Sequence, residues 1–156
     1  MEKCYKNILV PLDTSELAEL ALADALSVAR LCQADLTLLH VIAPIDKVFA
    51  TDLGYTVYID QEWGDQKQQA RDYLDSVCQR IDCNSLTVNR VVETGAPAET
   101  IIDYAKRNPI DLIVMATHGR SGLQRWVYGS VADKVLRGAH VPVLLVRARP
   151  ERENVA

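Results

Sequence analysis

The sequence lacks the features that mark membrane, secreted and disulfide-bonded proteins. No apolar run approaches the roughly 20 residues that span a bilayer. The first residues, from Met1 to Asn7, lack the shape of a signal peptide. Four cysteines are present without a Cys-x-x-Cys pair, namely Cys4, Cys32, Cys78 and Cys83. Because two of the cysteines fall on apolar helix positions, we expect small buried thiols in a reducing cytoplasm. Because no apolar run is long enough, we expect no membrane contact.

Strong charge of either sign is also missing. Only 24% of the residues are charged, and the formal net charge is −4. Nucleic-acid-binding domains usually show a basic patch and a high pI, so we expect no nucleic-acid partner. The 156 residues, 49% of them hydrophobic, fit one domain with a sizeable core. We place this domain at residues 1–147, followed by a polar tail at 148–156.

The sequence also lacks most signatures of catalysis. It has neither a phosphate loop with its lysine nor the Gly-x-Gly start of a dinucleotide fingerprint. It shows no histidine pair at ligand spacing and no nucleophilic serine elbow. We therefore predict no catalytic residue, because no positioned base or lysine is evident. An enzyme that uses the loop residue His118 is a weaker alternative, and His40 and His140 are interpreted as structural residues at strand ends.

The most informative stretch runs from Leu112 to Ser130. It begins with an apolar run, Leu112 to Ala116, which is typical of a strand covered on both faces. A loop with Gly119 and Gly122 follows, and Gly129-Ser130 opens a helical pattern. Backbone N–H groups at a helix start are unpaired and carry positive partial charge, and glycine lets a ligand approach them closely. The stretch therefore predicts a candidate anion site.

A purely structural interpretation of the same stretch is equally open. Glycines often only punctuate a turn, and Ser130 with Asp133 three residues later makes an acceptable helix cap. The segment by itself does not decide between an anion site and an ordinary turn. A similar cap is predicted near the start of the chain, with Asp13 as the cap and Glu16 three residues later. Gly138 is predicted to end the last helix as a C-terminal glycine.

Apolar strand patterns alternate with helical patterns along the whole chain. Strands are predicted at residues 7–12, 35–42, 86–93, 112–116 and 142–146, and helices at 15–32, 65–83, 97–108 and 130–137. Residues 43–62 show no clear period and are interpreted as a binding loop or a surface insertion. The alternation predicts an α/β fold, an open parallel sheet with helices on both faces.

Periodicity alone leaves the strand order open. The order 3-2-1-4-5 is compatible with right-handed crossovers and reverses its winding between the first and fourth strands. Ligands of such sheets bind beyond the carboxyl ends of the strands at this reversal. That order places Pro11-Leu12-Asp13 opposite Thr117-His118-Gly119.

Six segments, in order along the chain, together resemble the universal stress protein family. They are Lys6-Asn-Ile-Leu-Val-Pro-Leu-Asp13, Leu36-Thr-Leu-Leu-His-Val41, Gly95-Ala-Pro-Ala-Glu-Thr-Ile101, Asp111-Leu-Ile-Val-Met-Ala-Thr-His-Gly-Arg-Ser-Gly122, Gly129-Ser-Val-Ala-Asp-Lys-Val-Leu136 and Pro142-Val-Leu-Leu-Val146. Any one of them is weak, but the set is specific. The resemblance implies a flavodoxin-like, Rossmann-like fold with five parallel strands in the order 3-2-1-4-5. It also implies a cytoplasmic homodimer that acts in the stress response and, in one branch of the family, ATP binding.

The ATP-binding branch carries Gly, two residues, Gly, nine residues, then Gly followed by Ser or Thr. Gly119, Gly129 and Ser130 match this pattern, whereas Ala116 stands where the first glycine is expected. Its methyl group near the expected ribose either crowds the ligand or is absorbed by a small shift. Overpacking by a carbon atom typically costs about 1–3 kcal/mol.

The resemblance implies a nucleotide site and a role for each part of it. Adenosine is bordered by residues 11–13 and adenine meets the backbone of Val41, while phosphates lie along Gly119 and at the helix start. Asp13 faces the ribose or a Mg²⁺ ion. The expected site residues are Pro11, Leu12, Asp13, Val41, Met115, Ala116, His118, Gly119, Arg120, Gly129, Ser130 and Val131. Arg120 and Arg125 either pair with phosphates or are simply solvated.

Two hypotheses of different classes follow. The first is a homodimeric universal stress protein that binds ATP, AMP or another adenylate with little turnover. The second is a nucleotide-independent dimeric module that recruits an unknown protein partner through its dimer surface and the 43–62 loop, and Ala116 favours it. In both, the apolar edge from Val141 to Val146 pairs with its copy.

Overall fold

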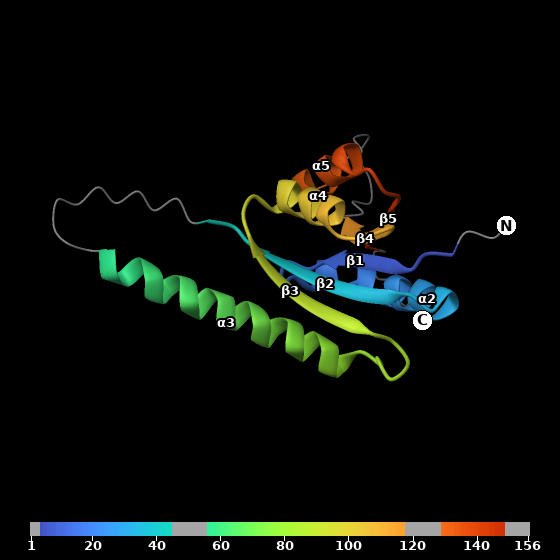
Figure 1. The fold of residues 1–156 in the computed structure, drawn as a ribbon, viewed down its shortest axis with the longest axis horizontal. Coiled ribbons are helices and arrows are strands. Elements are labelled where there is room, and N and C mark those ends of the chain that lie inside the picture. The colour runs from blue at the N-terminus through green and yellow to red at the C-terminus, as the bar shows by residue number, and fades with distance from the viewer. Residues whose placement is uncertain (1–3, 45–55, 118–128, 149–156) are drawn as a thin grey trace, which may run out of the picture.

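The computed structural model describes residues 4–44, 56–117 and 129–148, without the side chains of residues 56–62. Five parallel strands form one sheet with helices on both faces, as expected (Figure 1). The strands are β1 (Asn7–Pro11), β2 (Asp35–Ile42), β3 (Val88–Thr94), β4 (Leu112–Thr117) and β5 (Val143–Arg147). The helices are α1 (Glu16–Glu19), α2 (Ala21–Cys32), α3 (Thr56–Arg80), α4 (Pro97–Arg107) and α5 (Ser130–Gly138). Each strand lies within about two residues of its predicted bounds.

The strand order is β3-β2-β1-β4-β5, so the predicted order 3-2-1-4-5 is confirmed. β1 pairs with β2 as far as Pro11 and Leu39. Its pairing with β4 ends earlier, at Leu9 and Ile113. Because both strands continue beyond that point, the two central strands part toward their carboxyl ends. This opening is the winding reversal at which ligands of such sheets bind.

Two hydrophobic clusters cover the two faces of the sheet. Even-numbered residues such as Ile8, Leu38 and Val114 pack against α2 and α3. Odd-numbered residues such as Leu9 and Ile113 pack against α4 and α5. In Figure 1, α4 and α5 lie together above the sheet and α3 lies below it. Alternation of side chains along each strand therefore assigns every strand residue to one helical layer.

The predicted helix at 15–32 is wrong as a single element, because it divides at Leu20. α1 has a single turn, and Leu20 donates its backbone N–H to Leu17 before α2 begins. The predicted cap is also wrong: Ser15 is the N-cap and accepts a hydrogen bond from Ala18 N, whereas Asp13 accepts from Ser15. The apolar spacing is preserved across the break, so periodicity did not reveal it.

α3 begins at Thr56, nine residues before the predicted start. The prediction that 43–62 lacks helix is therefore wrong from Thr56 onward, and residues 45–55 lie outside the described part of the chain. The first turns of α3 run past the ends of the strands in Figure 1. Because this end lies beyond the sheet, it needs no apolar stripe, which explains why the sequence showed no period there.

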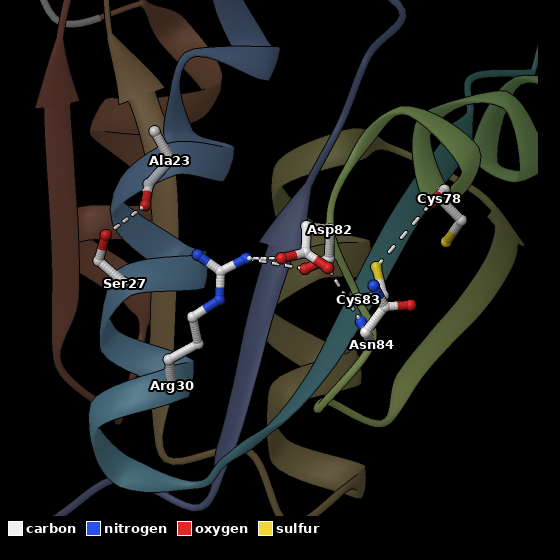
Figure 2. Close-up of polar contacts among 7 residues, drawn as sticks. All are labelled: Ala23, Ser27, Arg30, Cys78, Asp82, Cys83 and Asn84. Carbon is white, nitrogen blue, oxygen red and sulfur yellow. Dashed lines mark hydrogen bonds and ion pairs between the residues drawn. The ribbon is translucent and has the colours of Figure 1, made fainter.

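The described cysteines form no disulfide, and the expectation that they are buried is wrong. Cys4 is exposed, and the other three are half-buried. Cys83 Sγ donates to the carbonyl oxygen of Cys78 at 3.9 Å. Figure 2 shows this contact beside the ion pair between Arg30 of α2 and Asp82. Burial raises the pKa of both the Cys78 and the Cys83 thiols. Cys78 lies in the last turn of α3 and Cys83 lies just after it. The raised pKa of both thiols disfavours the reactive thiolate form.

Gly138 does not end α5 in the way expected. It is the last residue of the helix rather than a left-handed cap, and among the described glycines only Gly95 has a positive φ. A Cβ at Gly138 would stand 2.6 Å from Cδ1 of Ile102 in α4. Glycine therefore favours close packing of α5 on α4, since a Cβ would have to displace the end of the Ile102 side chain. Among the described residues, no helix is long and apolar enough to cross a membrane.

Candidate functional site

A cavity of about 290 Å³ lies at the carboxyl ends of the central strands, where β1 and β4 part. This volume is close to the lower end of small-molecule sites, which span roughly 300–1,000 Å³. Most of the predicted site residues line it: Pro11, Leu12, Asp13, Val41, Met115, Ala116, Gly129, Ser130 and Val131. The remaining predicted residues, His118, Gly119 and Arg120, lie outside the described residues, as does Arg125.

The cavity lies mainly on the α4–α5 face of the sheet. Five of its strand residues, Pro11, Leu39, Val41, Met115 and Thr117, have odd numbers, the parity that faces α4 and α5, and Ala116 is the exception. The first turns of both helices complete the wall, through Pro97 and Ile101 in α4 and Ser130 to Ala132 in α5. The strand tips therefore form a floor, and two helix N-termini form the roof.

The α5 N-terminus presents unpaired donors to this cavity. Its N-cap is Gly129, which has no side chain to accept a hydrogen bond, and its first helical bond runs from Asp133 N to Gly129 O. Helix geometry leaves the N–H groups of Ser130, Val131 and Ala132 without partners inside the helix. The interpretation of Ser130 as a cap is therefore wrong, since Ser130 stands one position inside the helix. What remains is an N-terminus suited to an anion.

The opposite lip of the cavity, around Asp13, is internally hydrogen-bonded. Asp13 Oδ1 accepts from the backbone N–H of Ser15 at 3.0 Å and also from its hydroxyl. Ser15 Oγ in turn accepts from Ala18 N at 3.1 Å. Between them, Thr14 has a φ of 70°, a left-handed conformation that is costly for a β-branched residue. The lip is held in one strained arrangement, of the kind that gathers at functional sites.

Ala116 and Thr117 end β4 with different orientations. Ile113 N donates to Pro142 O, and Ala148 N donates to Thr117 O, so odd-numbered residues of β4 bond to β5. The backbone of Ala116 therefore faces the parting between β1 and β4, while its methyl packs against the α2–α3 cluster. Thr117 faces α4 and α5. It is 3% exposed, and its Oγ1 has no hydrogen-bond partner among the described residues.

A polar network supports the α1 side of the cavity. His40 Nδ1 lies 2.8 Å from the Leu12 carbonyl oxygen, so this nitrogen carries the proton and donates, which ties β2 to the residue that follows β1. The His40 ring also meets the Tyr73 ring edge-on at 6.0 Å. Tyr73 donates to Glu19, which binds both terminal nitrogens of Arg80 at 2.9 and 3.0 Å. Burial, followed by the Glu19 carboxylate, raises the pKa of Tyr73, so the hydroxyl stays protonated and donating.

The described residues offer little to a metal ion on their own. They contain no group of three His, Cys, Asp or Glu side chains placed to hold one. Asp13 is the single carboxylate in the cavity lining, and one of its oxygens is already bonded to Ser15. Mg²⁺ commonly binds one or two carboxylates together with substrate phosphates and water. The lining therefore fits a magnesium ion that arrives with phosphates rather than one held by the protein.

Several lining residues were not predicted from the sequence. They are Leu17, Ala18, Leu39, Pro97, Ile101, Thr117 and Ala132. Period-two alternation could have found Leu39 and Thr117, which lie two residues from the predicted Val41 and Met115. No local signal pointed to Pro97 or Ile101, because α4 reaches the cavity only through its packing on α5.

The sequence pattern of a family described as the universal stress protein family matches residues 4–147. Universal stress protein MJ0531 from Methanocaldococcus jannaschii is 31% identical over 97% of this chain and 87% of its own length. The structure of a universal stress protein UspA from Lactobacillus plantarum is 30% identical, with a TM-score of 0.76, covering 94% of this chain and 100% of that one. A universal stress protein in complex with cAMP, 20% identical, shares the fold with a TM-score of 0.62 over 94% of this chain and 100% of its own.

Proposed function

The chain belongs to the universal stress protein family, and from this premise we propose that it binds ATP or a related adenine nucleotide and acts in the stress response. The observation that carries the proposal is the cavity between the parted strands, roofed by an α5 N-terminus without a side-chain cap. A related fold holds cAMP, so the fold is compatible with an adenine nucleotide.

Each part of the cavity suits one part of such a ligand. Apolar side chains at Pro11, Val41 and Met115 suit a purine base, and the backbone at Val41 offers it hydrogen bonds. The N–H groups that open α5 suit the phosphates, because they combine free donors with the positive end of the helix dipole. Asp13 suits the ribose hydroxyls or a Mg²⁺ ion on the phosphates. His118, Gly119 and Arg120 complete the phosphate site in this proposal.

Ala116 does not argue against this ligand as strongly as its place in the sequence implies. Its methyl packs against the α2–α3 cluster, on the face of β4 opposite to α5. In this proposal the phosphates at the α5 N-terminus lie away from the Ala116 methyl, and the ribose is the part of the ligand that lies nearest to it. It does line the cavity, and this is the observation that favours the second hypothesis, a dimeric interaction module without nucleotide.

The nucleotide proposal is tested by titration calorimetry of the purified protein with Mg-ATP, AMP and Mg-GTP. Saturable binding of an adenylate, with weaker binding of the guanylate, is the expected result. Mass spectrometry of ligand released from freshly purified protein identifies which adenylate is carried. Absence of heat with every adenylate, after any co-purified ligand has been removed, refutes the proposal and leaves the interaction module. A protein partner recovered with the nucleotide-free chain then supports that alternative.

We expect a cytoplasmic homodimer that pairs through Val141 to Val146. β5 lies at the edge of the sheet, and Leu144 on it is 39% exposed. An uncovered apolar edge favours pairing with a second strand. Sedimentation equilibrium should show a dimer that Leu144→Asp converts to monomer. Leu31→Asp is the matched control, since Leu31 is 83% exposed on α2 and should leave the dimer intact. A wild-type monomer at every concentration contradicts the expectation.

A further inference from the structure

The side chain of Thr117 is an anomaly in this fold. It is 3% exposed at the end of β4, and its Oγ1 has no hydrogen-bond partner among the described residues. Buried hydroxyl groups are nearly always paired, because an unpaired one loses its bonds to water without replacement. Its own carbonyl is paired with Ala148 N, so the backbone at this position is satisfied and only the hydroxyl is left over.

The place of Thr117 connects this hydroxyl to the α5 N-terminus. Thr117 lies two residues after Met115 on β4, so its side chain shares the face that packs against α5. It lines the same cavity as Gly129, Ser130 and Val131. Thr117 and the free N–H groups of α5 therefore border one cavity, from the floor and from the roof. Both are donors, and neither finds an acceptor within the described protein.

We propose that Thr117 binds the ligand and selects for phosphate, its hydroxyl donating a hydrogen bond to a phosphate oxygen held at the α5 N-terminus. This inference rests on the proposed function, because the phosphate belongs to the proposed adenine nucleotide. A negatively charged oxygen is the acceptor that this set of donors lacks, and hydrogen bonds to charged acceptors are stronger than neutral ones. Thr117 thus gives the protein a preference for nucleotides over nucleosides.

The test compares Thr117→Val with Thr117→Ser in the full-length protein. Valine keeps the shape of threonine without the hydroxyl, whereas serine keeps the hydroxyl without the methyl. Affinities for adenosine, AMP and ATP are measured by calorimetry, with competition for the weaker ligands, and the thermal midpoint of each ligand-free variant is recorded. Thr117→Val should bind AMP and ATP about tenfold more weakly or worse, with adenosine unchanged. Thr117→Ser should bind AMP and ATP within about threefold of wild type.

The midpoint separates this role from a structural one. If the hydroxyl is unpaired without ligand, Thr117→Val keeps or raises the thermal midpoint, because it removes a buried polar group that has no partner. A lowered midpoint with unchanged AMP affinity shows a structural hydroxyl and overturns the inference. An equal loss for adenosine and AMP also overturns it. Wild-type protein that binds no adenylate refutes the proposed function itself, whereas wild-type binding that Thr117→Val leaves intact refutes only the assignment to Thr117.

Discussion

The N-termini of α1 and α5 both border the cavity, and a serine near each of them has a different role. At α1, Ser15 is the N-cap, accepts a hydrogen bond from Ala18 N and is itself bonded to Asp13. At α5, Ser130 stands one residue later, inside the helix, and the N-cap is Gly129. A shift of one position therefore decides whether a serine satisfies the helix end or leaves it open.

The difference continues into the two layers of the fold. The α1–α3 layer pairs its polar groups through the Tyr73–Glu19–Arg80 network and the Arg90–Asp75 and Arg30–Asp82 ion pairs. On the α4–α5 face, the open helix end and the unpartnered Thr117 hydroxyl meet at one cavity. Unpaired polar groups cost stability, so a protein that keeps them at one place has a use for them there. The α4–α5 layer also has ion pairs, Lys134–Glu99 and Arg137–Asp133, but in the proposed function this layer recognises the ligand while the other supports the fold.

The largest effect is expected from closing the open helix end with Gly129→Val. A Cβ at Gly129 meets nothing within 4 Å among the described residues, so the unfolding free energy should change by no more than about 1 kcal/mol. The added side chain occupies ligand space, and ATP affinity measured by calorimetry should fall about 10- to 100-fold. Gly64→Val is the matched control, because Gly64 of α3 also has open space but lies away from the cavity. Unchanged ATP binding in Gly129→Val would contradict the proposal that the α5 N-terminus binds the ligand.

The two serines should respond in opposite ways to alanine. Ser15→Ala removes a cap and should cost about 1 kcal/mol of unfolding free energy, which lowers the thermal midpoint by about 2–4 °C. Ser130→Ala should change stability by less than about 0.5 kcal/mol, since its side chain is exposed and does not cap the helix. It should instead weaken ATP binding several-fold, by roughly the net value of one hydrogen bond. Equal destabilisation by both changes, in thermal unfolding, contradicts the assignment of the caps.

Thr14→Gly should stabilise the closed lip. The left-handed φ of 70° costs a non-glycine residue about 1–2 kcal/mol. Glycine removes this strain, but its larger conformational entropy in the unfolded chain cancels roughly half of the gain in stability. We expect a net increase of about 0.5–1 kcal/mol in the free energy of urea unfolding. A lower value would mean that Thr14 makes a stabilising contact that outweighs its strain. Thr87→Gly, an exposed position outside this lip and without a positive φ, controls for the general effect of glycine on the unfolded chain.

The smallest effect is expected in the pH dependence of stability, through the ion pair between Glu19 and Arg80. The hydrogen bonds from Arg80 lower the pKa of Glu19 from its usual 4.5 in spite of its burial. The stabilisation is therefore complete above pH 4.5 and is lost as the pH falls through the lower folded pKa. With Arg80 55% exposed, solvent screens the pair and its contribution to stability is small. Unfolding between pH 6 and 3 should show a weaker pH dependence for Glu19→Gln than for wild type, and parallel curves would contradict the assigned pairing.

The sequence predicted more of the fold than of the candidate site. The strands were found because buried parallel strands are continuous apolar runs, as in Leu112 to Thr117. The break at Leu20 and the start of α3 at Thr56 were missed, because the apolar spacing crosses the first and is absent from the second. Ser130 was open to two interpretations, since a single sequence cannot show on which side of a helix boundary a serine falls.

By itself the sequence determined the alternation of strands and helices, the glycine-rich approach to α5 and the resemblance to its family, since all three are local patterns of residue type. Only the tertiary structure decided that β1 and β4 part beyond Leu9 and Ile113, that Pro97 and Ile101 of α4 reach the cavity, and that the Thr117 hydroxyl has no partner among the described residues. Strand parity can place a side chain on a face, but which groups meet there depends on how the helices pack across the sheet, and that packing joins residues far apart in the chain.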